Sequence, residues 1–179
     1  MKMTAGSSQA KQFGVVVVAL FVALCRVRGE ELPPTPKNYF NDYARITSQS
    51  TQHALNKRLA KFDKVTSNQV VVAVFPKMES TSSLDDYTLR VANAWGVGQR
   101  GKNTRARAGV TLFVFVQNRT MRIQVSYRLT SVLTDALCKQ ILDDELGPHF
   151  QRGDFDGGLT AGVDAMLRIA ARADHPGTK

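Results

Sequence analysis

The sequence predicts an α/β protein, a three-layer α/β/α sandwich around a small mixed sheet of three to five strands. Helix-like and strand-like segments alternate along the chain. The strand-like segments include continuous apolar runs, which are typical of strands covered on both faces. Two neighbouring strands are joined too tightly for a parallel crossover, so the sheet must be partly antiparallel.

The first helix and the first strand open the predicted domain. The helix is expected from Ser48 in "SQSTQHALNKRLAKF", whose apolar residues fall on one helical face behind a Ser/Thr cap. The strand spans Gln69 to Phe75, an apolar run that is rich in β-branched residues and stopped by Pro76.

The second helix is expected behind Ser83, in "LDDYTLRVANAW". The next run, "GVGQRG", has the glycine spacing of a dinucleotide-binding fingerprint. A helix precedes this run and a strand follows it, which is the reverse of the order that a pyrophosphate site requires. We therefore expect its glycines to end the helix at Trp95 and keep the loop open.

Two further strands, "VTLFVFV" and "TMRIQVSY", are joined only by "QNR" and must form an antiparallel hairpin. In the second strand apolar residues alternate with polar ones, so one face is expected to be buried. The expected buried residues are Met121, Ile123, Val125 and, by the same alternation, Tyr127.

Two helices complete the domain. Thr134 is a natural N-cap for "DALCKQILDDEL", which is expected to end at Gly147-Pro148. The last helix is expected from about Phe155 to Arg172, with Asp154 or Asp156 as its cap.

Length and composition favour one globular domain, since the chain has 179 residues, of which 43% are apolar and 22% charged. We predict four parts along the chain: a signal peptide (1–29), a linker (30–41), the α/β/α domain (42–172) and a tail (173–179). The linker is expected to be extended because it contains three prolines and no apolar period.

The N-terminal segment predicts export. An apolar run from Phe13 to Leu24 follows two lysines and has the length of a signal-peptide core, which is too short to span a bilayer comfortably. We expect a periplasmic or secreted protein with no stable membrane span after signal removal. Arg26 and Arg28 leave an uncleaved N-terminal anchor open as the alternative. Cys138, the only cysteine after residue 29, is expected to be a small buried hydrophobe.

Charge is distributed unevenly along the sequence. The stretch 87–134 contains eight basic residues and no acidic residue, so a positive field is expected around the middle of the protein. Nucleic acid is not the expected partner, because the arginines are not interleaved with exposed aromatic residues. The histidines, His53, His149 and His175, lack metal-ligand spacing and are expected to be solvated.

Several segments together carry a family resemblance. They are "YFNDYARITSQSTQHALNKRLAKFDKVTSNQVVVAVFP", "NAWGVGQRGK", "AGVTLFVFV", "RIQVSYRLTSVLTDAL" and "GPHFQRGDFDGGLTAGVDAML". Over roughly residues 38–170 the chain resembles the TPM-domain family, which includes thylakoid acid-phosphatase-like proteins and photosystem II repair factors. The resemblance implies an exported α/β/α sandwich. Some such proteins are linked to metal ions, to acid phosphatase activity or to the upkeep of membrane complexes, so the resemblance implies these as possible properties of the chain.

The chain departs from the family pattern in one region. Where the family usually has an acid, then Asn or Asp, then glycine, this chain has "RAG", which puts Arg107 and Ala108 in place of the acid. Where the family usually has Glu-Val-Gly-Tyr-Gly-Leu-Glu, this chain has "QVSYRLT". The replacements are Gln124 and Thr130 for the glutamates and Ser126 and Arg128 for the glycines. Only Asp135 keeps its carboxylate.

These departures predict a cationic pocket in place of a metal site. Calcium takes six to eight oxygen ligands, several of them charged. We therefore expect no cofactor: the calcium that the resemblance implies should bind weakly or not at all, with Asp135 as the only retained candidate ligand. Arg107 and Arg128 are expected to pair with Asp135, or to bind an anion together with the amide donors that follow Thr134.

The expected function follows from this pocket. We expect a non-catalytic or weakly catalytic envelope module that binds a small anion or an envelope protein. The alternative is a metal-dependent acid phosphatase acting on phosphomonoesters, for which Asp135 is the one candidate catalytic residue. A protein-interaction scaffold is the third class.

Overall fold

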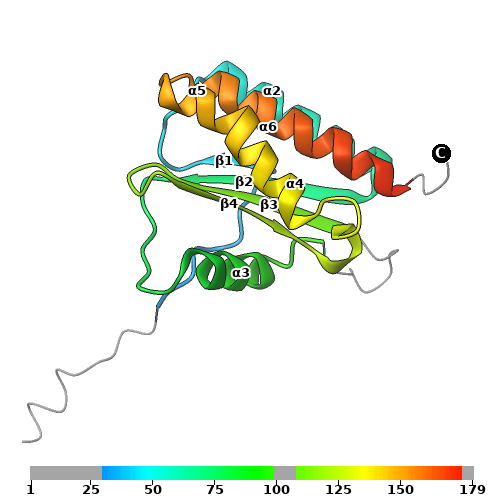
Figure 1. Cartoon of the computed structure of the whole chain (residues 1–179), viewed down its shortest axis with the longest axis horizontal. Helices are drawn as coiled ribbons and strands as arrows, with labels where there is room; N and C mark the ends of the chain where they lie inside the picture. The colour runs from blue at the N-terminus through cyan, green and yellow to red at the C-terminus, as the bar shows by residue number, and fades with distance from the viewer. Residues whose placement is uncertain (1–29, 99–107, 175–179) are drawn as a thin grey trace, which may run out of the picture. The chain divides into compact units, whose positions relative to one another are not determined.

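The three segments predicted as strands form one mixed sheet, and a short fourth strand extends it (Figure 1). The computed structural model describes residues 30–98 and 108–174. The strands are β1 (Phe40–Asp42), β2 (Asn68–Phe75), β3 (Ala108–Phe115) and β4 (Thr120–Val125). The helices are α2 (Gln49–Thr66), α3 (Leu84–Trp95), α4 (Asp135–Gln140), α5 (Gly147–Gln151) and α6 (Phe155–Ala170), with the 3-10 helices η1 (Tyr127–Leu129) and η3 (Ala171–Asp174) and a π-helix, η2 (Ile141–Leu146).

The pairing of the strands explains their composition. β2 pairs in parallel with β1 and β3, and β3 pairs antiparallel with β4, so the predicted hairpin is confirmed. All residues of β3 are buried, and β2 is buried except near its ends. Such continuous burial is expected of strands that helices cover on both faces.

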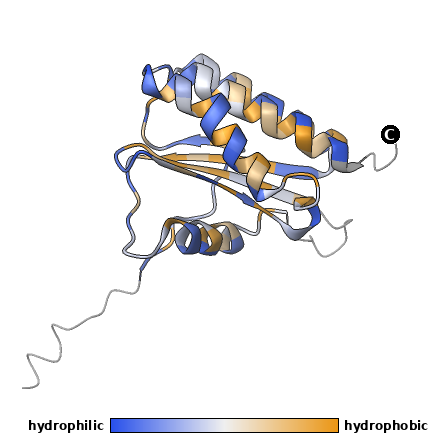
Figure 2. Cartoon of the chain, in the orientation of Figure 1, coloured by the Kyte–Doolittle hydropathy of each residue, from blue (hydrophilic) through white to orange (hydrophobic). Residues whose placement is uncertain are grey.

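Helices cover both faces of the sheet, which confirms the predicted α/β/α sandwich (Figure 1). α3 lies on one face, and α2 with the helices from α4 to α6 lies on the other. The side chains of β2 alternate accordingly: Val70 and Val72 belong to the core under α2 and α6, whereas Val71 belongs to the core under α3. The helices carry both hydrophobic and hydrophilic residues, as expected of amphipathic helices that cover a sheet (Figure 2).

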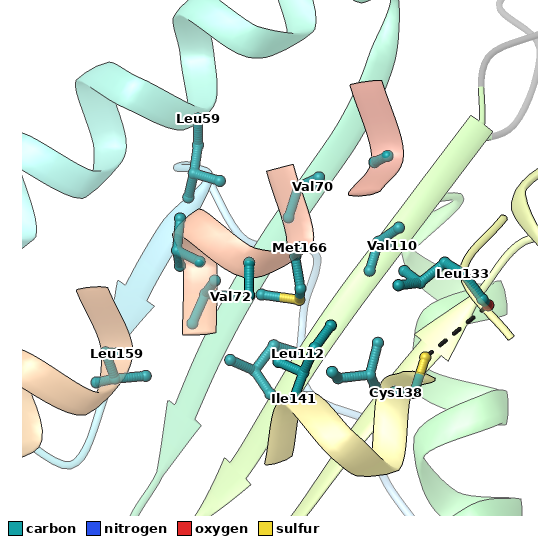
Figure 3. Packing of buried hydrophobic residues seen from close by; sticks show 14 of the residues in the cluster. Leu59, Val70, Val72, Val110, Leu112, Leu133, Cys138, Ile141, Leu159 and Met166 are labelled. Atoms are coloured by element: carbon teal, nitrogen blue, oxygen red, sulfur yellow. Dashed lines mark hydrogen bonds between the residues drawn. The ribbon is translucent and has the colours of Figure 1, made fainter. Parts of the chain in front are cut away.

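The larger core contains the single described cysteine. Figure 3 shows Cys138 among apolar side chains such as Leu133, Ile141 and Met166. Burial raises the pKa of the Cys138 thiol to about 11, with a smaller contribution from the nearby charge of Asp135. The thiol is therefore protonated at neutral pH, which fits the prediction of a small buried hydrophobe.

Side-chain caps begin the helices where the sequence predicts. The hydroxyls of Ser48, Ser83 and Thr134 each accept a backbone N–H bond from the residue three positions later. The carboxylate of Asp154 accepts the N–H of Gly157 at 2.9 Å and begins α6. These bonds satisfy backbone donors that have no partner inside the helix.

The helix that begins at Asp135 does not end at Gly147-Pro148, so this prediction is wrong. The chain passes through η2 and continues as α5 beyond Pro148. In the π-helix η2 the backbone hydrogen bonds span five residues and not four. The Gly147 N–H, for example, donates to the Leu142 carbonyl. Pro148 has no N–H to leave unpaired, and the first turn of α5 is a position where proline is tolerated.

The predicted linker, 30–41, overlaps the domain. Phe40 and Asn41 belong to β1, and Phe40 is buried in the larger core. Nearer the N-terminus, the Pro33 carbonyl accepts a hydrogen bond from Trp95 Nε1 at 2.8 Å. A strand of three residues carries no periodic signal, so the sequence pattern alone misses it.

Leu32–Lys179 forms one compact unit. The predicted signal peptide, 1–29, and residues 175–179 of the predicted tail lie outside the described residues. Among the residues that the structure describes, no helix is long and apolar enough to cross a bilayer.

The second strand of the hairpin ends at Val125, earlier than the alternation predicts. Ser126 follows it, and its hydroxyl accepts the N–H of Gly109 at 2.8 Å. Tyr127 then begins η1 and is 92% exposed, so the prediction of a buried ring is wrong. The helical turn ends the two-residue period that would have kept Tyr127 on the apolar face.

Candidate functional site

The predicted site residues lie where β4 ends and α4 begins. Arg128 is in η1, Thr134 is the N-cap of α4 and Asp135 is its first residue. All three are exposed. Arg107 lies outside the described residues.

A cavity of about 290 Å³ opens beside this segment. Its lining residues are Ile123, Gln124, Val125, Thr130, Leu133, Thr134 and Asp135. The fold thus brings both positions of the family glutamates, Gln124 and Thr130, together with the one retained carboxylate. Arg128 does not line this cavity, although it lies in the same turn.

The cation beside Asp135 is Arg122, from β4. Its Nη2 lies 3.9 Å from Asp135 Oδ1, and its Nε lies 3.1 Å from Asp85 Oδ1 of α3. The Nε is buried and has no partner in hydrogen-bond geometry among the described residues, so its contact with Asp85 is electrostatic. Because the Asp135 side chain is 94% exposed, water screens its pairing with Arg122 strongly.

This arrangement differs from the expected pairing of Asp135. Arg128 makes no ion pair within the described part of the chain. The reason is that the chain enters η1 at Tyr127, which leaves Arg128 exposed. Alternation in β4 places Arg122 on the polar face, so the sequence contains a signal for it, but its distance to Asp135 depends on how α4 packs.

The side-chain amide of Gln124 fits the hydrogen-bonding groups around it. Its Nε2 donates to Thr88 Oγ1 at 2.8 Å and to the Asp85 carbonyl at 3.4 Å. Thr88 Oγ1 is available only as an acceptor, because the hydroxyl proton goes to the Leu84 carbonyl at 2.7 Å. Two acceptor oxygens on α3 therefore require a donor on β4, which glutamine supplies and ionised glutamate does not.

Replacing Gln124 with glutamate is expected to lower the free energy of unfolding by about 1–3 kcal/mol at neutral pH, because the carboxylate meets two acceptors. The loss should shrink below about pH 4, where a protonated glutamate can donate again. Urea unfolding of Gln124→Glu and the wild type, at neutral pH and below about pH 4, measures this loss of stability. The control, Gln124→Met, should show no such pH dependence. Equal stability of Gln124→Glu and the wild type at neutral pH contradicts the assigned donor.

No group of three or more His, Cys, Asp or Glu that could hold a metal ion occurs in residues 30–98 and 108–174. His53 is exposed, as expected, and His175 lies outside the described residues. His149 is not simply solvated: its Nδ1 lies 2.6 Å from Asp154 Oδ2. This bond, with the Gly157 N–H, lowers the pKa of Asp154. The cap of α6 therefore stays ionised into more acidic solution than a free aspartate does.

Comparison with known proteins gives a family match over most of this domain. A family model for the TPM domain matches residues 40–169, from the start of β1 to the residue before the last of α6. No curated protein matches the sequence.

Solved bacterial structures share the fold. The N-terminal domain of a protein from P.gingivalis is 27% identical, with a TM-score of 0.64 over 74% of this chain and 81% of that chain. The BA42 protein of the psychrophilic bacterium Bizionia argentinensis is 19% identical, with a TM-score of 0.57 over 74% of this chain and 86% of that chain. The N-terminal domain of the cg2496 protein of Corynebacterium glutamicum is 14% identical, with a TM-score of 0.55 over 84% of this chain and 90% of that chain.

Proposed function

Because the chain belongs to the TPM-domain family, we propose that it is an exported module of the cell envelope, non-catalytic or weakly catalytic, that binds an anionic group on a small molecule or partner protein. One observation carries this proposal. The cavity that contains both family glutamate positions has a single carboxylate, Asp135, and Arg122 lies 3.9 Å from it.

The residues of the cavity do not fit a divalent cation. The oxygen donors are one carboxylate, the hydroxyls of Thr130 and Thr134, and the amide of Gln124. Calcium requires more oxygen ligands and more negative charge to offset the loss of its hydration. The guanidinium of Arg122 lies 3.9 Å from Asp135, the only carboxylate among the described residues that line the cavity, and competes with a second cation for it.

The same residues and their neighbours favour an anion. Arg128 is exposed and makes no ion pair within the described residues, so its planar donors are free for phosphate or carboxylate. The segment 99–107, which lies outside the described residues, contains four basic residues, Arg100, Lys102, Arg105 and Arg107. Gly109 lies two residues after the end of this segment, and its N–H donates a hydrogen bond to the hydroxyl of Ser126, which is two residues before Arg128.

The alternative function is a metal-dependent acid phosphatase. It is favoured by the exposure of Asp135 at a cavity, which leaves one carboxylate accessible to a substrate. Hydrolysis of p-nitrophenyl phosphate by the purified full chain, with calcium, with magnesium and with EDTA, separates the two functions. We expect no metal-stimulated turnover. Turnover that calcium or magnesium stimulates and Asp135→Asn abolishes would instead establish the phosphatase.

Anion binding is tested by titrating the full chain with inorganic phosphate and following backbone amide NMR signals. We expect saturable shifts near Thr130 and Thr134. Arg128→Glu should weaken binding about tenfold or more, because a charge-assisted hydrogen bond contributes roughly 1.5–3 kcal/mol. The control is Arg168→Glu on α6, an exposed arginine 3.9 Å from Glu145. Equal binding by the two variants contradicts an anion site at Arg128.

A further inference from the structure

A second and larger cavity lies at the other end of the β3–β4 hairpin. Its volume is about 840 Å³, and it lies between the hairpin turn and the segment from α5 to the start of α6. These segments lie at the same end of the sheet (Figure 1). The two cavities share no lining residue: Thr120 and Met121 of β4 line this one, whereas Ile123, Gln124 and Val125 line the cavity beside Asp135.

The walls of this cavity are apolar and held in place by the core. Met121 and Phe150 line it and also pack against the larger core. Phe155 meets Phe150 edge to face, with ring centroids 5.2 Å apart. An edge-to-face pair is favoured by about 0.5–1.5 kcal/mol, and small-molecule sites are usually largely pre-formed, so we expect the apolar surface to exist before a ligand arrives.

The mouth of the cavity is polar and carries one positive charge. Arg119, Gln117 and Gln151 line it and are exposed. No acidic residue lines the cavity, and Arg119 makes no ion pair within the described residues. Its charge is therefore uncompensated next to the apolar walls, where a ligand anion can approach it.

We propose that this cavity binds a small amphipathic carboxylate whose unbranched aliphatic chain lies against Met121, Phe150 and Phe155. The carboxylate pairs with Arg119, and the amides of Gln117 and Gln151 offer further donors. A volume of this size is within the range of small-molecule sites, roughly 300–1,000 Å³. The site is independent of the residues around Asp135.

The probe is sodium octanoate, titrated below its micelle concentration into the full chain and followed by NMR of the methionine methyl and backbone amide groups. We expect saturable shifts at Met121 and at the amides of Phe150 and Phe155. Octyltrimethylammonium has the same chain with the opposite charge and should bind at least about tenfold more weakly. No saturable shift with octanoate, or equal affinity for the two probes, overturns the proposal.

Arg119→Gly isolates the role of the side chain. Arg119 has a φ of +53°, a backbone conformation that glycine adopts more easily, so this variant should remain folded. We expect its affinity for octanoate to fall about tenfold or more, and Arg168→Glu to keep the wild-type affinity. Unchanged affinity in Arg119→Gly overturns the proposal. Because neither variant alters Arg128, phosphate shifts near Thr134 report separately on the other site.

Discussion

Replacing Gly98 with alanine is expected to lower the free energy of unfolding by about 2–5 kcal/mol, which is a large share of the roughly 5–15 kcal/mol that stabilises a domain. Gly98 has a φ of +76°, where a side chain costs about 1–2 kcal/mol. A Cβ at this position would also meet the backbone N of Gly109 and lie 2.5 Å from its Cα. Backbone atoms of a central strand cannot easily move away, so overpacking adds about 1–3 kcal/mol.

Two matched variants separate the strain from the clash. Gly153→Ala has the same φ of +76° with no atom within 4 Å of the added Cβ, so it should show the strain alone. Gly109→Ala has no such φ but places its Cβ 2.5 Å from the Val97 carbonyl oxygen, so it should show the clash alone. Urea unfolding of the three variants measures each contribution. A Gly98→Ala loss no larger than that of Gly153→Ala contradicts the close approach.

This contact also bears on the proposed anion site. Gly98 and Gly109 flank the segment 99–107, which carries four of the basic residues of the chain. Gly109 exchanges hydrogen bonds with Ser126: its N–H donates to the hydroxyl, and its carbonyl accepts the Ser126 N–H, both at 2.8 Å. Gly98 approaches Gly109 closely, and Gly109 is hydrogen-bonded to Ser126, which directly precedes η1 with Arg128. The two ends of the chain on either side of 99–107 therefore lie close to this turn.

Much of the fold is predictable because its elements carry strong local signals. β2 and β3 are continuous apolar runs, and α2, α3 and α6 begin at side chains that cap them. β1 is not predictable in this way, because its three residues are strand-like only through their pairing with β2. The continuation through Pro148 is missed for a similar reason: the proline ends a regular α-helix, but η2 before it changes the hydrogen bonding.

The candidate site is predictable only in part. Comparison with the family pattern identifies Gln124, Thr130 and Asp135, and the structure brings these residues to one cavity. The partner of Asp135 requires the tertiary structure, because Arg122 reaches it from the preceding strand. The larger cavity has no sequence signal at all, since its walls come from 114–121 and 147–155, which are distant along the chain.

Replacing Leu146 with alanine is expected to lower the free energy of unfolding by about 2–5 kcal/mol, because the side chain is fully buried. Leu146 ends η2 and packs directly over Gly162 of α6. A Cβ at Gly162 would meet Leu146 Cδ1 and lie 2.8 Å from its Cγ. Gly162→Ala should therefore destabilise the protein as well, even though alanine favours a helix over glycine by about 1 kcal/mol.

The double variant tests whether these two positions form one contact. With Leu146 shortened, the methyl group that Gly162→Ala adds enters the vacated space, so the double variant should lose at least about 1 kcal/mol less than the sum of the single losses. Urea unfolding of all four proteins gives this coupling. The control pairs Gly162→Ala with Phe113→Ala in the other core, where the losses should add. Additive losses for Leu146 and Gly162 contradict the direct contact.

This contact also affects the larger cavity. α5 follows Leu146 directly, and a Cβ at Gly158 would lie 2.8 Å from Phe150 Cδ1, so Phe150 also depends on close packing against α6. If Gly162 allows η2 to approach α6, it also positions the Phe150 ring that forms a wall of the cavity. Gly162→Ala should then weaken octanoate binding without touching Arg119. Binding that stays unchanged while stability falls would show that the wall is held by other contacts.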